Sequence, residues 1–550
     1  MKIKVYIKNI IPVAAVALAM GGMTSCTGDL DVTPISPKLE TQYDVNGLFE
    51  KCYAKFAMAG VGDGSINSAG DGNPDVTGYN DYGMTNLVRQ MWNSNELTTD
   101  EAICTWGDTG IPEFNYNTYD DTEPMLRAYF ASITSGISCC NQYLEVAADH
   151  DATMTAEVRY LRALEYYLLM DAFGNIPFST TITKPSQISR AEAFEWIVNE
   201  LLEIEPQLSA PKGKKSNETG YGRIDQAAAW MLLARLYLNA EVYTGEAKWD
   251  EAAKYAKQVM DLTTYKLNEN GSANGQWSAY QMLFMGDNGE TDAAYEAIFP
   301  ILQNSQTTVG YGNSLFLIAS CFNESMHANP NDPNGYNGTT AHWDGNRARP
   351  DLVAKFFPNN DAPQIPSYDM PAAAGDDRAL FYGEGHTLDI DNVSEFTEGY
   401  GVAKFISYKS DGSSTYDPQF TDADWFFFRK AEAYLTYAEA TARKNGGNAT
   451  SEGIAALKAL RDRAHAATKT SFTLDEILDE WSREFYFEGR RRVDLIRFGK
   501  YGGMNCDYKW QWKGGVKEGR NFEEYMNIFA IPATQLTSNG NLVQNPGYVK

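Results

Sequence analysis

Histidine and cysteine are scarce in this sequence, and their spacing fits none of the common metal or redox motifs. The 550 residues include five His and seven Cys. There is no His-Glu-x-x-His pair, and no two cysteines have the Cys-x-x-Cys spacing of zinc or redox sites. We therefore expect most cysteines to be small buried apolar residues. They stand at positions 26, 52, 104, 139, 140, 321 and 506.

Positive charge is also in short supply. Lys and Arg total 46 against 72 Asp and Glu, which gives a formal net charge of −26. Nucleic-acid binding requires clustered Lys and Arg to neutralise phosphates, so this class of function is disfavoured. The dense basic run Arg490-Arg491-Arg492 lies close to Glu484 and Glu488 in the sequence. Its position predicts an internal ion-pair network rather than a basic surface patch.

Motifs of the common enzyme classes are missing. The sequence has no Gly-x-Ser-x-Gly elbow, no phosphate-binding loop and no zinc signature. A glycoside hydrolase needs only two facing carboxylates, and sequence spacing does not exclude such a pair among 72 acidic residues. The missing motifs therefore give no support to an enzyme of these classes, and a hydrolase with two carboxylates is left as an alternative.

The apolar run at the N-terminus is too short to cross a bilayer, which takes roughly 20 residues. It covers residues 10–20 and follows three Lys residues, a layout typical of a secretory signal peptide. The run leads into Gly-Met-Thr-Ser-Cys26, which resembles a bacterial lipobox with Met23 where Leu is usual. We predict that residues 1–25 are removed, that Cys26 is lipidated, and that residues 26–38 form a flexible tether. An ordinary signal peptide followed by a chance Cys is the alternative.

Residues 224–261 have the pattern of two packed helices. Apolar side chains recur at the spacing of one helix face, first at Ala229, Leu232, Leu233, Leu236 and Ala240, and again at Ala252, Ala253, Ala256, Val259 and Met260. A short break at residues 243–246 separates the stripes, and Asp250 is predicted to cap the second helix. The pattern is typical of a tetratricopeptide-type hairpin, which needs neighbours of the same kind to bury its apolar face.

Such neighbours are predicted on both sides of a long irregular stretch. Helical periodicity indicates helices at residues 39–59, 123–149, 155–173, 190–208, 425–444, 451–467 and 474–487. Counting hairpins within 123–262 and 425–487 gives about four tetratricopeptide-like units and a mainly α fold.

Between and before these helices the sequence is rich in Gly, Asn, Asp, Pro and Tyr. This composition extends over residues 60–115 and 263–424, where the apolar residues show little periodicity. With 13% aromatic residues overall, the chain is too aromatic for these segments to be disordered. We interpret them as an irregular layer that packs on the helices and carries a ligand site.

Five stretches make the chain similar to the SusD/RagB family of Bacteroidetes outer-membrane glycan-binding lipoproteins. They are VRYLRALEYYLLMDAFGNIP (158–177), GRIDQAAAWMLLARLYLNAEVYTG (222–245), FFFRKAEAYLTYAEA (426–440), EWSREFYFEGRRRVDLIRFG (480–499) and IPATQLTSNGNLVQNPGY (531–548). They follow the family's order along nearly the whole chain. Shorter phrases such as NELTTDEA and AAGDDRAL resemble its starch-binding member.

The resemblance implies a fold, a location and a function. It implies one SusD-like domain over residues 39–550, held at the surface of the outer membrane by a lipid. It also implies a non-catalytic protein that binds starch or malto-oligosaccharides and passes them to a SusC-like TonB-dependent transporter. A SusD-like protein for a different glycan is the first alternative, and a glycoside hydrolase or a purely structural lipoprotein is the second.

By the same resemblance, the glycan-binding residues are Trp106, Tyr311, Trp343 and Arg89. The three rings form an aromatic arc on which sugars stack, and Arg89 contacts sugar hydroxyls. One position departs from the starch-binding member, because Cys104 stands where that protein has a further Trp. The loop after Trp106 is also one residue shorter.

No cofactor is required by this function, although relatives in the family can carry a structural calcium ion. Asp422 and Asp424 stand where its ligands come from, and carboxylate oxygens suit Ca²⁺. The alternative is that both are solvated loop acids.

Overall fold

The structure is a computed structural model that describes residues 44–59, 76, 79 and 83–548. The predicted signal peptide, Cys26 and the tether lie outside these residues, as does most of the loop predicted at 60–82. The described residues from Asn46 onward form one compact unit, and the description below concerns that unit.

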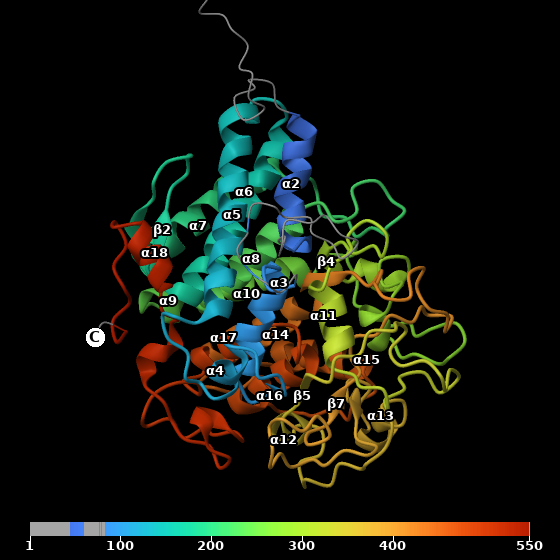
Figure 1. The fold of residues 1–550 in the computed structure, drawn as a ribbon. Coiled ribbons are helices and arrows are strands. Elements are labelled where there is room, and N and C mark those ends of the chain that lie inside the picture. Colours follow the sequence, from blue (N-terminus) through green and yellow to red (C-terminus); the bar gives the residue numbers. More distant parts are fainter. Residues whose placement is uncertain (1–43, 60–75, 77–78, 80–82, 549–550) are drawn as a thin grey trace, which may run out of the picture. The chain divides into compact units, whose positions relative to one another are not determined.

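Helices that follow one another in the chain pack in pairs (Figure 1). In the first half α5 (Pro124–Ala147) packs on α6 (Ala152–Phe173), and α6 packs on α7 (Arg190–Ile204). Further on, α8 (Gln226–Leu238) packs on α10 (Trp249–Met260). The predicted helices at 123–149, 155–173 and 190–208 are thus present with shifted ends.

The second group of helices continues this packing. α10 contacts α14 (Ala431–Lys444), which in turn contacts α15 (Ser451–Arg463) and α16 (Leu474–Phe485). The predicted helix at 39–59 corresponds to α2 (Val45–Ala57) within the described residues. The count of four tetratricopeptide-like units stays a prediction.

Local sequence signals set the helix starts. Ser189 with Glu192, and Thr473 with Glu476, form reciprocal capping boxes at the starts of α7 and α16. Asp225 caps α8 by accepting from the backbone N–H of Ala227.

The predicted cap at Asp250 is wrong. α10 begins at Trp249 after Lys248, so Asp250 lies in the first turn, where its charge favours the helix dipole instead. The break before it holds a short helix, α9 (Ala240–Thr244), which ends at Gly245 with φ of +80°.

The helix predicted over residues 425–444 is half wrong. Its first part is a strand, β8 (Trp425–Arg429), paired antiparallel with β4 (Ala297–Ile301). The run WFFFR is buried on both faces, so its apolar residues show no alternation that would distinguish strand from helix.

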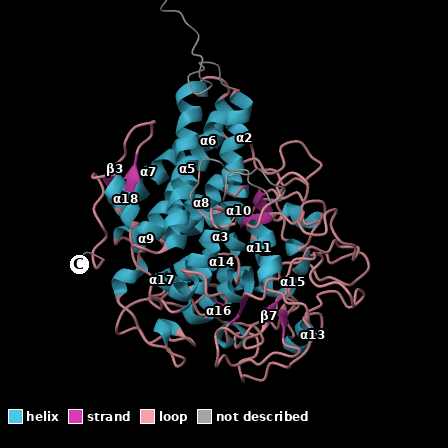
Figure 2. Ribbon diagram, viewed as in Figure 1, coloured by secondary structure: helices cyan, strands magenta, loops and turns pink. Residues whose placement is uncertain are grey.

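The irregular layer is confirmed for residues 263–424. Figure 2 shows mostly loop there, with few and short strands. Its regular elements are η4 (Gln281–Phe284), η5 (Asp292–Tyr295), β4, α11 (Asn313–Ser320), β5 (Asn346–Ala348), α12 (Pro350–Val353), α13 (Met370–Ala374), β6 (Phe381–Tyr382) and β7 (Gly401–Val402).

The prediction of an irregular layer over residues 87–115 is wrong for most of that segment. It contains α3 (Leu87–Trp92), the π-helical turn η2 (Asn93–Leu97), β1 (Ala102–Cys104) and α4 (Ile111–Asn115). Every residue of α3, η2 and β1 is buried. These elements are too short for periodicity to predict. The side-chain amide of Asn115 satisfies the backbone N–H and carbonyl oxygen of Cys104, and the Asn95 amide donates to the carbonyl oxygen of Gly489.

The remaining elements are short. They are β2 (Ile176–Phe178) paired with β3 (Ser186–Ile188), η3 (Glu205–Gln207), α17 (Arg491–Arg497), η6 (Lys513–Gly515), η7 (Glu524–Asn527) and α18 (Ala533–Ser538).

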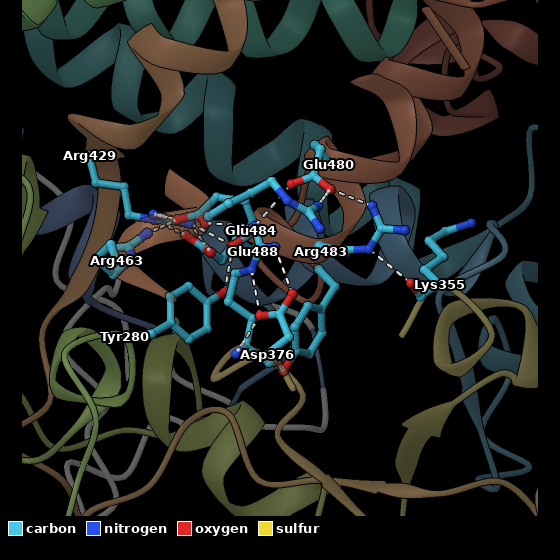
Figure 3. A network of polar contacts seen from close by, with 12 residues as sticks. Tyr280, Lys355, Asp376, Arg429, Arg463, Glu480, Arg483, Glu484 and Glu488 are labelled. Atoms are coloured by element: carbon cyan, nitrogen blue, oxygen red, sulfur yellow. Dashed lines mark hydrogen bonds and ion pairs between the residues drawn. The ribbon is translucent and has the colours of Figure 1, made fainter. Parts of the chain in front are cut away.

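The predicted ion-pair network around Arg490–Arg492 is confirmed. Arg490 pairs with Asp494 at 3.0 Å, and Arg491 pairs with Asp100 at 2.7 Å. Neighbouring acids extend the network into the centre of the unit (Figure 3). There the buried carboxylate of Glu484 contacts Arg429 at 2.7 Å, and Glu488 contacts the same guanidinium at 2.8 Å.

The cysteines also behave as predicted. Cys52, Cys104, Cys139, Cys140 and Cys321 are buried free thiols, and Cys506 is half-buried.

Candidate functional site

A short strand pair brings two distant tryptophans together. β1 pairs antiparallel with β5, with Cys104 opposite Asn346. Trp106 follows the end of β1 and Trp343 precedes β5, so the antiparallel register places both rings at the same end of the pair. The indole Nε1–H of Trp106 donates a hydrogen bond to the backbone carbonyl oxygen of Trp343 at 2.9 Å.

Helix α11 supports both rings. The backbone N–H of Trp343 donates to the carbonyl oxygen of Ala319 at 2.8 Å, and that of Gly345 donates to Ser320 at 2.9 Å. Phe316, on the same helix, lies under Trp106 with ring centroids 6.2 Å apart. The loop before β5 is therefore anchored to a buried helix rather than left free.

Tyr311, just before α11, completes the group of three rings. Its centroid lies 5.8 Å from that of Trp343, with the planes at 69°, while Trp343 and Trp106 are 6.4 Å apart at 49°. All three rings are half-buried. The phenol oxygen of Tyr311 accepts a hydrogen bond from the amide of Gln419 at 2.8 Å. We call Trp106, Tyr311 and Trp343 the aromatic arc.

The arc borders a hollow of about 840 Å³. Arg89 also lines it and is only 6% exposed. Its guanidinium lies 4.8 Å from the centre of the Phe316 ring, and Nη1 donates to the carbonyl oxygen of Tyr311 at 3.4 Å. The four predicted glycan-binding residues thus surround one cavity, and their role in binding stays a prediction.

The chain positions Arg89 through one asparagine. Asn86 caps α3 by accepting from the backbone N–H of Arg89 at 2.8 Å, and it also accepts from Asn313 at 3.2 Å. The start of α3 is thereby tied to the start of α11. Gly83 and Gly312 flank this junction, where a Cβ would lie within 2.4 Å of neighbouring atoms.

Other lining residues were not predicted. The hollow is also lined by Tyr79, Met84, Asp108, Thr109, Ile111, Pro124, Met125, Arg127 and Gln419. Arg127 lies on α5, which the sequence assigns to the helical scaffold. Gln419 lies in an irregular loop where no periodic signal exists.

Cys104, where the starch-binding member has Trp, does not border the hollow. It is fully buried in β1, and its backbone exchanges hydrogen bonds with the Asn115 side chain. Burial raises the pKa of its thiol to about 12. Position 104 therefore adds no fourth ring to the aromatic arc.

The predicted calcium ligands make other contacts. Asp424 accepts from the backbone N–H of Gln303 at 2.7 Å and from the Tyr221 hydroxyl at 2.6 Å. Asp422 accepts from the backbone N–H of Ser305 at 2.7 Å. Asp424 is buried, so the alternative of a solvated loop acid is wrong for it. Burial raises its pKa to about 7 against these hydrogen bonds.

No group of three or more His, Cys, Asp or Glu side chains that could hold a metal ion occurs within the described part of the chain. The calcium ion stays a prediction. The contacts give both carboxylates a structural role in fastening the loop before β8 to residues 303–305.

Comparison with known proteins identifies relatives over the full length. The SusD family model matches residues 322–548. The Starch-binding protein SusD of Bacteroides thetaiotaomicron is 36% identical, over 99% of each chain.

Solved structures show the same fold. A SusD superfamily protein from Parabacteroides distasonis aligns with a TM-score of 0.65 and 19% identity over 92% of this chain and 98% of that one. Surface glycan-binding protein A from Bacteroides thetaiotaomicron, in complex with laminarihexaose, aligns with a TM-score of 0.64 and 20% identity over 91% and 98%. These matches confirm the predicted mainly helical fold.

Proposed function

The chain belongs to the SusD family, and we propose that it binds starch and malto-oligosaccharides in the hollow beside the aromatic arc. Proteins of this family bind carbohydrates without catalysis and are associated with the outer membrane at the cell surface, so the chain is a glycan-binding protein and not an enzyme. The similarity to the relative named for starch binding supports the choice of starch.

The tilt between the three rings is the observation that carries the proposal. Ring faces offer apolar surface to the CH-rich face of a pyranose. Successive rings of the aromatic arc are turned by 49° and 69°, so a straight, flat chain cannot lie on all of them. An α-1,4-glucan is a natural helix and turns from one glucose to the next, as the rings do.

The expected affinity is modest. Each stacked ring contributes about 1 kcal/mol by analogy with other aromatic contacts. Three such rings, with hydrogen bonds from Arg89 and Gln419 and after the cost of ordering the sugar, correspond to a dissociation constant in the millimolar range. Exchange would then be fast enough to release the glycan to a partner.

A second glycan remains a candidate because of Cys104. Cys104 is buried and does not border the hollow, so it supplies no stacking ring in place of the Trp of the starch-binding member. A differently linked glycan would bind without stacking on a ring at that position. β-1,3-glucan is therefore included in the test below.

Affinity electrophoresis distinguishes these glycans. The soluble chain from Thr27 is run in native gels cast with amylopectin, pullulan, dextran, laminarin or no polysaccharide. We expect retardation only in amylopectin and pullulan, which contain α-1,4 links. Retardation in laminarin alone supports the second candidate, and equal mobility in all gels contradicts both.

Two variants locate the site in the same gels. Trp343→Ala removes the central ring and is expected to abolish retardation. Trp249→Ala, at a half-buried position on α10 that does not line the hollow, is the matched control and should retain it.

We further propose that Cys26 carries a lipid and that the protein delivers glycan to a SusC-like TonB-dependent transporter. The lipobox-like sequence before Cys26 supports the lipid. No helix in the described part of the chain is long and apolar enough to cross a membrane. Cys26→Ser should move the protein from the membrane fraction to the soluble fraction. The partner is tested by co-purification. We expect a TonB-dependent transporter to co-purify with the native chain, and no such transporter to co-purify with a tagged, unrelated lipoprotein.

A further inference from the structure

The hollow beside the aromatic arc continues into two further cavities. Tyr79 and Arg127 line both the hollow and a second cavity of about 860 Å³. Thr134, Ser138 and Ile182 line both this cavity and a third of about 270 Å³. Shared walls make the three adjoin in series. We call the second and third cavities together the α5 groove.

One face of α5 forms the floor of this groove. The lining residues of the second cavity recur along the helix at steps of three or four, at Arg127, Ala131, Thr134, Ser135, Ser138 and Gln142. This spacing puts them on a single face. The fifteen steps from the first to the last span roughly 22 Å at 1.5 Å per residue. The groove is thus long enough for a chain molecule rather than a single small ligand.

The floor is unusually rich in hydroxyl groups for a helix. At exposed positions Ala, Lys and Glu stabilise a helix more than Ser and Thr do. The Thr134 hydroxyl donates to the backbone carbonyl oxygen of Phe130 at 2.8 Å, and the Ser138 hydroxyl donates to the backbone carbonyl oxygen of Thr134 at 2.9 Å. With these protons directed to the backbone, the oxygen lone pairs are left as acceptors toward the groove. Such a surface complements the hydroxyl donors of a sugar.

The junction with the hollow and the opposite wall add the other groups that sugars use. At the junction the Arg127 guanidinium lies 5.0 Å from the centre of the Tyr79 ring, which places a donor next to an aromatic surface. On the opposite wall the Ile182 side chain is 57% exposed. It offers apolar contact beside Thr181 and Thr183, which line the third cavity.

We propose that the α5 groove is an extension of the glycan site and binds the part of a neutral polysaccharide chain that emerges from the hollow beside the aromatic arc. This inference rests on the proposed function. It predicts that the protein prefers long chains, because a short oligosaccharide fills only the hollow. It also assigns a function to the polar stripe of α5, which helix packing does not require.

Blocking the groove without touching the arc tests the proposal. Ser138 is exposed, so Ser138→Trp fills the groove with little cost to folding, and Thr183→Trp blocks the opposite wall if the first variant unfolds. Ser451→Trp, at an exposed serine on α15, is the matched control. Calorimetry measures the affinity of each soluble protein for maltotriose and for a long linear amylose fragment.

We expect the unaltered protein to bind the amylose fragment at least tenfold more tightly than maltotriose. Ser138→Trp should remove most of this preference and leave maltotriose binding unchanged, while Ser451→Trp changes neither. Unchanged amylose affinity in both blocking variants overturns the groove but leaves the proposed function intact. If neither ligand binds the unaltered protein, the proposed function fails and the extension fails with it. A blocking variant that only weakens association with the transporter assigns the groove to a protein partner and overturns the proposal.

Discussion

The indole N–H of Trp106 is bonded to the backbone of Trp343, 237 residues further along the chain, at 2.9 Å. The Trp106 ring is therefore held against the backbone of Trp343 before any ligand arrives. A ring fixed in this way loses little conformational entropy on binding. The bond also consumes the only polar group of the indole, so Trp106 can offer a glycan only its ring surface.

Replacing Trp106 by Phe should remove the hydrogen bond that holds the ring to the backbone of Trp343. The variant keeps an aromatic face but loses the N–H and leaves the Trp343 carbonyl oxygen without this partner. A hydrogen bond of this kind contributes about 1 kcal/mol, so we expect affinity for the preferred glucan to fall roughly fivefold to tenfold. Calorimetry measures the change. Trp249→Phe on α10 is the control, and an equal loss there would show that the effect is not local to the arc.

Gly345 is predicted to be required for the position of Trp106. A Cβ at this residue would lie 2.5 Å from two atoms of the Trp106 indole, which no real contact allows. Gly345→Ala should therefore displace the ring and weaken glycan binding about tenfold or more, with only a small change in melting temperature. Gly107→Ala is a close control, because a Cβ there meets nothing within 4 Å although it adjoins Trp106. Equal affinities of the two variants would contradict the steric argument.

The helical part of the fold was predictable because its signals are local. The α7 and α16 starts follow from capping boxes, and the faces of α5, α6 and α8 follow from apolar spacing. β8 was missed because its five buried residues carry no alternation. α3 and η2 were missed because their buried polar residues, such as Asn93 and Glu96, look like loop residues until their partners are known.

The site was predictable only by resemblance. Trp106, Tyr311 and Trp343 lie in three separate segments, and the pairing of β1 with β5 that joins two of them leaves no periodic mark in three-residue strands. Arg127 and Gln419 belong to the same hollow but could not be predicted, because no pattern in the sequence relates α5 to the loop before β8.

Glu484 is predicted to be among the side chains whose replacement is most damaging. Burial alone would raise its pKa, but Arg463, Arg429 and Arg378 outweigh this and lower the pKa to about 2 (Figure 3). Glu484→Gln leaves these buried guanidinium groups without their shared anion, which typically costs about 3–5 kcal/mol. Denaturant unfolding followed by circular dichroism measures the loss. Asp462→Asn breaks an exposed pair with Lys458 and should cost less than about 0.5 kcal/mol.

The pH dependence of the same variant follows from the sign of the shift. A carboxyl whose folded pKa lies below its unfolded value of 4.5 stabilises the fold above that value. This contribution is lost as pH falls from about 4.5 to about 2. The difference in stability between the unaltered protein and Glu484→Gln should therefore shrink over this window. A constant difference would contradict the ionised state of Glu484.

Asp424 should show the opposite dependence. Burial raises its folded pKa to about 7 from 3.8, so the folded state binds the proton more tightly than the unfolded state. Its contribution is fully present below about pH 4 and is lost as pH rises toward 7. Asp424→Asn keeps an acceptor for the Gln303 N–H and cannot ionise. With a chelator present, the melting temperature of the unaltered protein should fall relative to that of Asp424→Asn between pH 4 and pH 7. Asp361 is exposed, so the melting temperature of the control variant Asp361→Asn should change with pH as that of the unaltered protein does.

Added Ca²⁺ in the same experiment tests the calcium prediction. A cation held by Asp422 and Asp424 binds only the folded state and raises its melting temperature. It also competes with the proton, so the gain should be larger at pH 8 than at pH 5 and absent in Asp424→Asn. If Ca²⁺ produces no gain at pH 8, the two carboxylates act only through the backbone amides of Gln303 and Ser305 and the Tyr221 hydroxyl. The loop before β8 is then fastened by hydrogen bonds alone, and the prediction of a calcium ion is wrong.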